Sequence, residues 1–371
     1  VARDLKISLL CTPLPERSLP GIDYLDVSTP EFSLRYPYRR SERLRRRFQK
    51  IFRAFDIVHM HNLHNWGLDE SITACGRLMV STYGSDVLAA CIPGGTRGPV
   101  VDADEHTARG KGIALHLADH ITATSNTLAD GTAEYANIPR DEIEVIPFGV
   151  DPGLFAPRRI KRTERGHVGY CGGFRPSKGA RQFIEAAFLV RGRFGACTFS
   201  LYGDGHDRQQ LEGLVAARGG ADAIRFHDFV PHEQLPGVLD TFDMLAVPSI
   251  CQEAYSVLAV EAQAMQVPVV ASHIGGLTET VRHARTGLLV EPGNSAVLAD
   301  AICTLLGDEA RRLEFGRAAR EWVIEHHNWN DCLDHMIAAY RRVTDGYSRH
   351  HENSTENPAS TPTAKVQAAT A

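Results

Sequence analysis

The chain has 371 residues, 43% of them hydrophobic and 23% charged, with a formal net charge of −5 at pH 7. This length is enough for two hydrophobic cores, and the acidic balance gives no reason to expect a nucleic-acid partner, which usually requires a basic face. No apolar run approaches the roughly 20 residues that cross a bilayer, and the first residues lack the hydrophobic stretch of a signal peptide, so we expect a soluble protein.

Eight cysteines are scattered along the chain without a CxxC pair. Several lie in apolar runs, where a thiol behaves as a small hydrophobic group. This usage favours a reducing compartment, and we expect the protein to be cytoplasmic.

Short β-branched runs alternate with amphipathic stretches, which is the pattern of βαβ units and a parallel sheet. We predict a first series of strands at residues 6–11, 56–61, 78–82, 120–123 and 144–147, and a second at 168–171, 198–202, 224–226, 244–248, 267–272 and 287–290. The predicted fold class is therefore α/β, with two Rossmann-like domains whose parallel sheets face a central cleft.

The beginning of the first domain departs from this pattern. A Rossmann-like domain normally opens with a strand, a tight glycine turn and a helix, but no helix pattern follows residues 6–11. We expect the first of these units to be missing from the chain, the alternative being a first domain that is shortened in the protein itself.

A basic stretch from Arg39 to Lys50 carries Leu44 and Phe48 at near-helical spacing, with arginines around the other face. We predict a helix with a solvated basic face. The alternative is peripheral contact with anionic lipid at the inner face of a membrane.

Three histidines, His59, His61 and His64, lie at and just after the end of the second predicted strand. They have no carboxylate or thiol at ligand spacing, so we expect no metal site there.

A segment rich in glycine and proline, residues 148–157, separates the two series of strands and precedes a basic stretch at 158–165. It predicts a linker, and hence domains at 1–155 and 156–345. Residues 346–371 are rich in Ser, Thr, Pro, Ala and Asn, so we predict a disordered tail.

A strand-to-helix junction in the second domain carries Glu253 and Glu261, eight residues apart. Ser256 is a suitable N-cap, which places Glu253 in the preceding loop and Glu261 about one turn inside the helix. The loop carboxylate, beside free helix amides, suits sugar hydroxyls, and the second suits ribose hydroxyls. The alternative is that both glutamates are ordinary exposed residues.

The second domain opens with a strand, a glycine turn at Gly172 and Gly173, and a helix. Glycines let the backbone approach a diphosphate, and Arg175 and Lys178 would offset charge on a departing phosphate. Because the turn does not give GxGxxG, a dehydrogenase is not expected.

A third junction contains Gly275 and Gly276, which would allow close approach to a ligand, followed by Glu279. We predict that Glu279 is a first-turn residue favoured by the helix dipole.

Together these motifs resemble the family four retaining glycosyltransferases, which have the GT-B fold. The resemblance rests on the E-x7-E spacing of Glu253 and Glu261, the segment from Pro268 to Gly276 and the strand at 287–290. Residues 56–61, 83–86 and 146–151 also look like their counterparts, so the resemblance covers nearly the whole chain except the tail.

The resemblance implies a nucleotide-sugar donor site in the second domain. Glu253 would face the donor sugar near the reacting carbon, and Glu261 would bind ribose. Backbone contacts to sugar and phosphate would come from Tyr255, Ser256 and Val257.

Lys178 matches the family lysine on the donor diphosphate. The family usually has arginine where this chain has Gly173, and we expect Arg175, two positions later, to reach the same phosphate.

Tyr83, Gly84 and Asp86 would line the acceptor or sugar side of the cleft. Many relatives carry histidine where this chain has Tyr83. A phenol donates a hydrogen bond but titrates near pH 10, so we expect the contact without the acid–base behaviour of an imidazole.

The implied activity is hexosyl transfer, with retention of anomeric configuration, from a nucleotide-diphosphate donor to a sugar or lipid-linked acceptor in polysaccharide or glycolipid biosynthesis. The resemblance also implies that the last helix packs back on the N-terminal domain, and that no metal cofactor is required. A catalytically silent nucleotide-sugar-binding protein and a GT-B sugar-nucleotide epimerase are the alternatives.

Overall fold

A computed structural model of the chain describes residues 7–11, 22–26, 46, 49–61, 77–84, 87, 105–158, 166–195 and 197–346. Several sequence predictions fall outside these ranges. They are most of the helix between Arg39 and Lys50, His64, Asp86, the basic stretch 159–165 and the tail.

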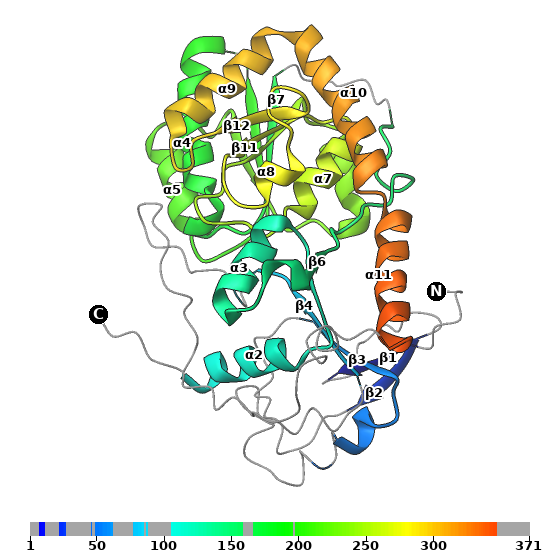
Figure 1. Cartoon of the computed structure of the whole chain (residues 1–371). Helices are drawn as coiled ribbons and strands as arrows, with labels where there is room; N and C mark the ends of the chain where they lie inside the picture. The colour runs from blue at the N-terminus through cyan, green and yellow to red at the C-terminus, as the bar shows by residue number, and fades with distance from the viewer. Residues whose placement is uncertain are drawn as a thin grey trace.

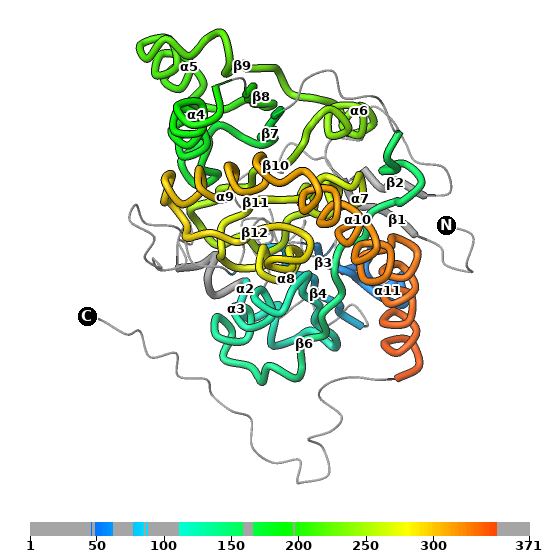
Figure 2. Tube along the Cα trace, turned by 90° about the horizontal axis from the view of Figure 1, so that it is seen from above, coloured from blue at the N-terminus to red at the C-terminus, as the bar shows by residue number. Residues whose placement is uncertain are grey.

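The C-terminal domain, the upper part of Figure 1, is built on a six-stranded parallel sheet with the order β12-β11-β10-β7-β8-β9, which can be followed in Figure 2. This is the order of a doubly wound nucleotide-binding sheet. In such a sheet the first and fourth strands lie side by side, and successive strands are added outward from them in opposite directions. Here these two are β7 and β10, which pair directly, with Val168 opposite Met244. The strands are β7 (His167–Cys171), β8 (Thr198–Tyr202), β9 (Ile224–His227), β10 (Met244–Val247), β11 (Val269–Ser272) and β12 (Gly287–Val290).

Helices cover both faces of this sheet because its strands are apolar on both sides. Met244 and Ala246 of β10 belong to one hydrophobic cluster, and Leu245 and Val247 belong to the other. The helices, with the short 3-10 segments η3 and η4, are η3 (Pro176–Lys178), α4 (Ala180–Phe194), α5 (Arg208–Ala217), η4 (His232–Gln234), α6 (Leu235–Leu239), α7 (Val257–Ala264), α8 (Leu277–Thr280), α9 (Ser295–Gly307) and α10 (Glu309–His326).

The N-terminal domain contains a four-stranded parallel sheet, β3-β4-β5-β6, and a separate parallel pair, β1-β2. One face of the larger sheet packs on two helices through residues such as Leu78 and Val80. The elements are β1 (Ile7–Cys11), β2 (Ile22–Asp26), β3 (Ile57–His61), β4 (Arg77–Thr82), α2 (Glu105–Leu117), β5 (His120–Ala123), α3 (Asn126–Ala136), η2 (Arg140–Glu142) and β6 (Ile143–Val145).

Every strand expected from the sequence is present, with ends that differ by at most two residues. The α/β class with two parallel sheets is confirmed. One strand, β2, was not predicted, and it pairs in register with β1 from Ile7 opposite Ile22 onward.

The segment between the two sheets packs on the C-terminal domain. Val150 and Phe155 are buried in its second hydrophobic cluster. The guanidinium of Arg320 in α10 donates hydrogen bonds to the carbonyls of Phe155 and Pro152 at 2.9 and 3.2 Å. These contacts fix the direction in which the chain enters the second domain.

The last helix, α11 (Trp329–Thr344), leaves the C-terminal domain and runs beside β3 and β4 (Figures 1 and 2). Ala339 forms a small buried cluster with Met79 and Ile146, and Met336 and Tyr340 pack against it. Thus α11 covers the face of the N-terminal sheet opposite α2 and α3.

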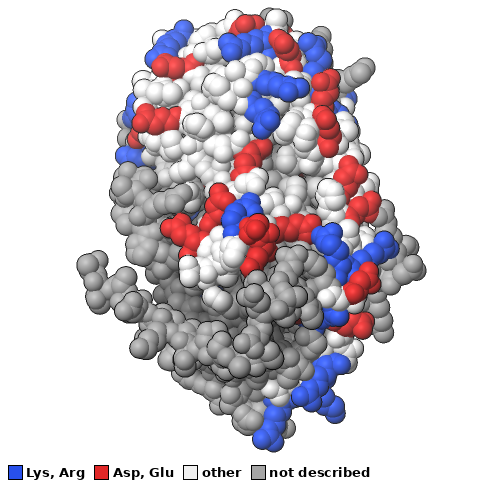
Figure 3. All heavy atoms as spheres, in the orientation of Figure 1, with Lys and Arg blue, Asp and Glu red and all other residues white. Residues whose placement is uncertain are grey.

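Basic and acidic side chains are interspersed over the described part of the face seen in Figure 3. Among the described residues, no helix is both long and apolar enough to cross a membrane.

Candidate functional site

The predicted site residues of the C-terminal domain gather where β7 and β10 lie side by side. Because the helices that follow these strands lie on opposite faces of the sheet, their loops separate and leave a crevice at the carboxyl ends. The loop after β7 carries Gly173 to Lys178, and the loop after β10 carries Glu253. The sheet order thus brings together two segments that are 75 residues apart in sequence.

Lys178 and Glu253 form an ion pair across this crevice. The Lys178 ammonium lies 2.5 Å from Glu253 Oε1, and the Ser249 hydroxyl donates to the same oxygen at 2.6 Å. The side chains are 31% and 14% exposed, so the pair is open to the crevice on the lysine side. A cation and a carboxylate held at one point can contact the charged and hydroxylated parts of one ligand.

Gly179 explains how the two loops approach so closely. Its φ is +72°, and a Cβ there would lie 1.8 Å from the carbonyl oxygen of Pro248. Only glycine therefore fits between Lys178 and the start of α4.

The loop that carries Glu253 ends at the N-cap of α7. The Ser256 hydroxyl accepts a hydrogen bond from the Ala259 amide at 3.3 Å, so the predicted N-cap is confirmed. Glu253 lies in the loop and Glu261 inside the helix, as the spacing predicted.

Glu261 is buried and bonded to a residue that the sequence did not single out. The His232 imidazole lies 2.6 Å from Glu261 Oε1. Burial raises the pKa of Glu261, and the hydrogen bond from His232 opposes this shift. Sequence analysis missed His232, the first residue of the short segment η4 after β9, because no motif at that position indicates a chemical role.

A pocket of about 380 Å³ opens beside Glu261. Its walls combine the segment between the domains, the first turn of α7 and the start of α11. It is lined by Phe148, Gly149, Val150, Asp151, Leu154, Phe155, His232, Val257, Glu261 and Trp329. A largely apolar pocket with one buried carboxylate suits a flat ring joined to hydroxyl groups.

Arg175 is exposed and lies at the N-cap of the short segment η3. Its charge lowers the pKa of Tyr170, whereas burial, Cys171 and Glu253 raise it, with burial the largest cause. The Tyr170 hydroxyl donates to the Gly173 carbonyl at 3.1 Å.

The two glycines of the turn differ in their surroundings. The Gly172 carbonyl is packed against Gly203 of the neighbouring loop, whereas a Cβ on Gly173 would meet its nearest atoms, Arg175 Nε and the Asp204 carbonyl oxygen, only at 3.8 Å. Of the pair, Gly173 is the one that leaves room at the end of β7.

The paired glycines of the third junction approach the protein's own backbone. A Cβ on Gly275 would lie 2.4 Å from the Glu253 carbonyl oxygen, and one on Gly276 would lie 2.3 Å from that of Ala254. The Gly276 amide also donates to the Glu253 carbonyl at 2.7 Å. The sequence predicted close approach to a ligand, whereas the group that these glycines approach in the structure is the Glu253 loop.

Glu279 lies in the first turn of α8, as predicted. Its carboxylate contacts α3 of the other domain, which the sequence did not indicate.

Tyr83 and Gly84 follow β4 and reach the Glu253 loop. A Cβ on Gly84 would lie 2.8 Å from the Ala254 side chain. The Tyr83 ring stacks on Phe148, with ring centroids 5.4 Å apart. In turn, the Tyr255 hydroxyl donates to the Phe148 carbonyl at 2.7 Å.

His59 and His61 are engaged with hydroxyl groups. The two nitrogens of His59 lie 2.6 Å from Tyr340 Oη and 2.7 Å from Ser81 Oγ, and His61 bonds to the Tyr83 hydroxyl. Burial lowers the pKa of both imidazoles. The Tyr83 phenol is thus hydrogen-bonded to the imidazole of His61.

Two cysteines flank the site. Burial, with Glu261 nearby, raises the pKa of Cys171 to about 12, so its thiol is protonated at neutral pH. Cys251, two residues before Glu253, is disulfide-bonded. The expectation of reduced thiols does not account for Cys251.

The architecture and this crevice define a two-domain α/β protein of the GT-B class. The solved structure of sucrose-phosphate synthase from Thermosynechococcus elongatus superposes with a TM-score of 0.71 at 22% identity, over 92% of this chain and 89% of that one. Anabaena HepE in complex with UDP superposes with a TM-score of 0.68 at 18% identity, over 86% of each chain. The chain has the GT-B fold, as predicted.

Family models match both halves of the chain. Residues 156–322 match "Glycosyl transferases group 1", and residues 1–154 match "Glycosyltransferase Family 4". The two matches meet at the segment between the sheets.

Curated relatives are glycosyltransferases by name. One is 2-deoxystreptamine glucosyltransferase from Streptomyces kanamyceticus, 31% identical over 62% of this chain and 62% of the relative. Another is D-inositol 3-phosphate glycosyltransferase from Arthrobacter sp. strain FB24, 30% identical over 64% of this chain and 59% of the relative. The alignments span about three fifths of the length of these relatives.

Proposed function

We propose that the protein is a retaining glycosyltransferase that uses a nucleotide-diphosphate sugar. The observation that carries the proposal is the contact between Lys178 and Glu253 at the point where the sheet order reverses. In such sheets this crevice is the usual ligand site. The family matches of both halves supply the reaction class.

In the proposed complex the donor replaces the ion pair between Lys178 and Glu253, and each of these side chains binds the donor instead. The Lys178 ammonium turns from Glu253 to the diphosphate, and the exposed Arg175 approaches the same phosphates. Glu253, released from the lysine, accepts hydrogen bonds from hydroxyls of the donor sugar. Glu261 accepts hydrogen bonds from the ribose, whose base enters the pocket beside Phe155.

The chemical step is a substitution at the anomeric carbon. The bond from this carbon to the diphosphate oxygen breaks, and its electron pair leaves with the nucleoside diphosphate. The acceptor hydroxyl oxygen bonds to the same face of the carbon, and its proton passes to the departing diphosphate. Lys178 and Arg175 stabilise the charge that grows on the leaving group, so we propose that no metal cofactor is required.

Tyr83 and Gly84 lie on the acceptor side of the Glu253 loop in this proposal. In this proposal the Tyr83 phenol, hydrogen-bonded to His61, positions a sugar hydroxyl. The acceptor in this proposal is a sugar or a lipid-linked sugar. The names of three relatives include 2-deoxystreptamine, D-inositol 3-phosphate and phosphatidylinositol monomannoside.

The test uses the full chain with UDP-glucose as the first donor probe and a panel of sugar and lipid-linked acceptors. Lys178→Ala and Glu253→Gln should each lower transfer by about 100-fold or more, the usual effect of removing one group that stabilises developing charge. Arg181→Ala is the matched control, because Arg181 pairs with Glu185 on the exposed face of α4.

The anomeric configuration of the product, read by NMR, tests retention, and added EDTA tests the independence from metal. Binding of sugar nucleotides without transfer or hydrolysis would instead indicate a silent binding protein. A donor sugar with altered stereochemistry and no new glycosidic bond would indicate an epimerase.

A further inference from the structure

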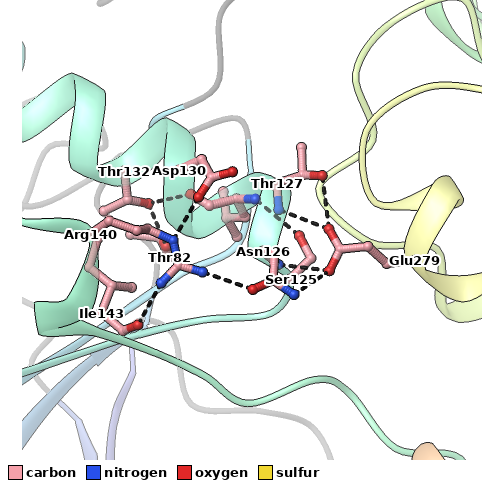
Figure 4. A network of polar contacts seen from close by, with 10 residues as sticks. Thr82, Ser125, Asn126, Thr127, Asp130, Thr132, Arg140, Ile143 and Glu279 are labelled. Carbon is pink, nitrogen blue, oxygen red and sulfur yellow. Dashed lines mark hydrogen bonds and ion pairs between the residues drawn. The ribbon is translucent and has the colours of Figure 1, made fainter.

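The carboxylate of Glu279 connects the two domains. Its Oε2 accepts hydrogen bonds from the Asn126 amide at 2.8 Å and from Asn126 Nδ2 at 3.0 Å. Its Oε1 accepts from the amide and the hydroxyl of Thr127, both at 2.8 Å. Figure 4 shows this carboxylate of α8 facing the first turn of α3.

The position of the carboxylate has an electrostatic reason. The first amides of a helix have no partner within the helix, and they form the positive end of its dipole. Ser125 caps the Leu128 amide at 3.0 Å, but the first turn of α3 has no acidic side chain of its own. The charge that α3 needs at its N-terminus therefore comes from the other domain.

The N-terminal domain holds its side of the contact firmly. Arg140 donates to Asn126 Oδ1 at 2.9 Å and to Asp130 Oδ1 at 2.6 Å. Because Arg140 binds Asn126 Oδ1, the side-chain amide of Asn126 is oriented with its Nδ2 toward Glu279 (Figure 4).

The C-terminal side of the contact is continuous with the loop that carries Glu253. Three residues before Glu279, Gly276 packs on the Ala254 backbone and bonds to the Glu253 carbonyl. The Ser125 hydroxyl also donates to the Ala254 carbonyl at 2.5 Å. The start of α3 is therefore attached at two points, Ala254 and Glu279, to the segment that positions Glu253.

We infer that Glu279 is a positioning residue for sugar transfer. Its carboxylate fastens the start of α3 to the Glu253 loop, and so sets the distance between the donor sugar and the acceptor-side residues Tyr83 and Gly84. This inference rests on the proposed function. It assigns Glu279 no contact with substrate.

The principal variant is Glu279→Gln, which keeps the size of the side chain and removes its charge. The glutamine side chain has only one acceptor oxygen, whereas Asn126 and Thr127 present four hydrogen-bond donors. Glu309→Gln is the matched control, because Glu309 is an exposed first-turn glutamate of α10 in the same domain. Thr127→Val removes one of the four hydrogen bonds and should give a smaller effect.

Three measurements on the full chain separate positioning from general damage. Calorimetric binding of UDP-glucose should stay within about two-fold of wild type, because the proposed donor contacts are made by the C-terminal domain, by the segment 148–155 and by the start of α11, and not by Glu279. Transfer at saturating donor should fall about ten-fold or more, since a small displacement of reacting groups costs this much. Small-angle scattering in the presence of UDP should show a larger radius of gyration for Glu279→Gln than for Glu309→Gln.

Wild-type transfer and an unchanged radius of gyration in Glu279→Gln would overturn the inference. If the wild-type chain transfers no sugar to any acceptor, the proposed function fails, while scattering still decides whether Glu279 holds the domains together. If Glu279→Gln does not fold, Thr127→Val decides by the same measurements, and no change in either would reject the role.

Discussion

Glu261 is a carboxylate whose environment opposes its charge. Its side chain is 6% exposed, and burial raises its pKa above the ordinary value of 4.5, although His232 partly offsets this shift. A ribose hydroxyl donates to a carboxylate but gains much less from a protonated carboxyl. Donor affinity should therefore depend on whether Glu261 is ionised.

We expect the dissociation constant for UDP-glucose to rise as the pH falls from 7 toward 4.5, the ordinary pKa value for this carboxyl group. Burial raises the pKa of Glu261 above the ordinary 4.5, so its protonation begins at a higher pH than that of an exposed carboxylate. Both phosphates of UDP-glucose are esterified, so the ligand's phosphates do not titrate as the pH falls. Glu261→Gln should bind about ten-fold more weakly at pH 7, the loss of one hydrogen bond to a charged group, and should show little pH dependence. Equal pH profiles for wild type and Glu261→Gln, measured by calorimetry with Glu309→Gln as control, would contradict this role.

At the scale of elements, the junction between β11 and α8 packs against the backbone of the Glu253 loop. Gly276 has helical dihedral angles, with φ −62° and ψ −10°, so an L-residue there is not strained by its backbone. The obstacle is the Ala254 carbonyl, 2.3 Å from a Cβ at this position. A methyl group must displace the Glu253 loop or α8.

Gly276→Ala should therefore lower kcat/KM for transfer by about ten-fold or more, because the displaced loop carries Glu253. Gly237→Ala, in α6, is the control, since a Cβ there would meet no described atom within 4 Å. It should keep full activity and gain about 0.5–1 kcal/mol of stability from its higher helix propensity. Steady-state kinetics and thermal melts of both variants test the difference, and full activity in Gly276→Ala would show that the loop tolerates the methyl group.

The sequence predicted elements and junctions well because both depend on local pattern. Alternating apolar runs located the strands, and Ser256 located the start of α7. The partners of Glu261 and Glu279 could not be predicted in this way. His232 and Asn126 reach these carboxylates only through the order of strands and the packing of the domains, which no local spacing encodes. β2 was missed because its five residues, Ile-Asp-Tyr-Leu-Asp, include two aspartates, a residue type that is depleted in strands.

At the scale of the whole molecule, the chain passes between the domains twice, at residues 148–157 and again between α10 and α11. The two passages meet at His327. The Val150 amide donates to the His327 carbonyl at 2.8 Å, and the Tyr255 hydroxyl lies 2.9 Å from His327 Nδ1. Burial lowers the pKa of His327 from 6.5 to about 4, with a further contribution from His326, and burial also lowers the pKa of His59. The native state therefore excludes protons that the unfolded chain binds.

Stability should consequently fall as the pH drops from about 6.5 toward 4. The folded-state pKa of His327 is depressed, so its contribution is present above the unfolded value and lost below it. A shift from 6.5 to about 4 corresponds to about 3 kcal/mol at the acid end. The drop in Tm between pH 7 and pH 5 should be smaller for His327→Gln than for wild type. His335→Gln in α11 is the control, and equal drops in all three proteins would argue against His327 as the cause.

The packing of α11 against β3 and β4 also constrains how the protein is made. Residues 57–146 leave the ribosome long before Ala339 and Tyr340, which complete the small cluster around Met79 and Ile146. During synthesis the face of the N-terminal sheet that α11 covers therefore stays exposed until almost the entire polypeptide has been translated. A nascent chain arrested before residue 329 should therefore expose Met79 to chaperones and to solvent exchange, even after the segment that contains it has acquired its strands.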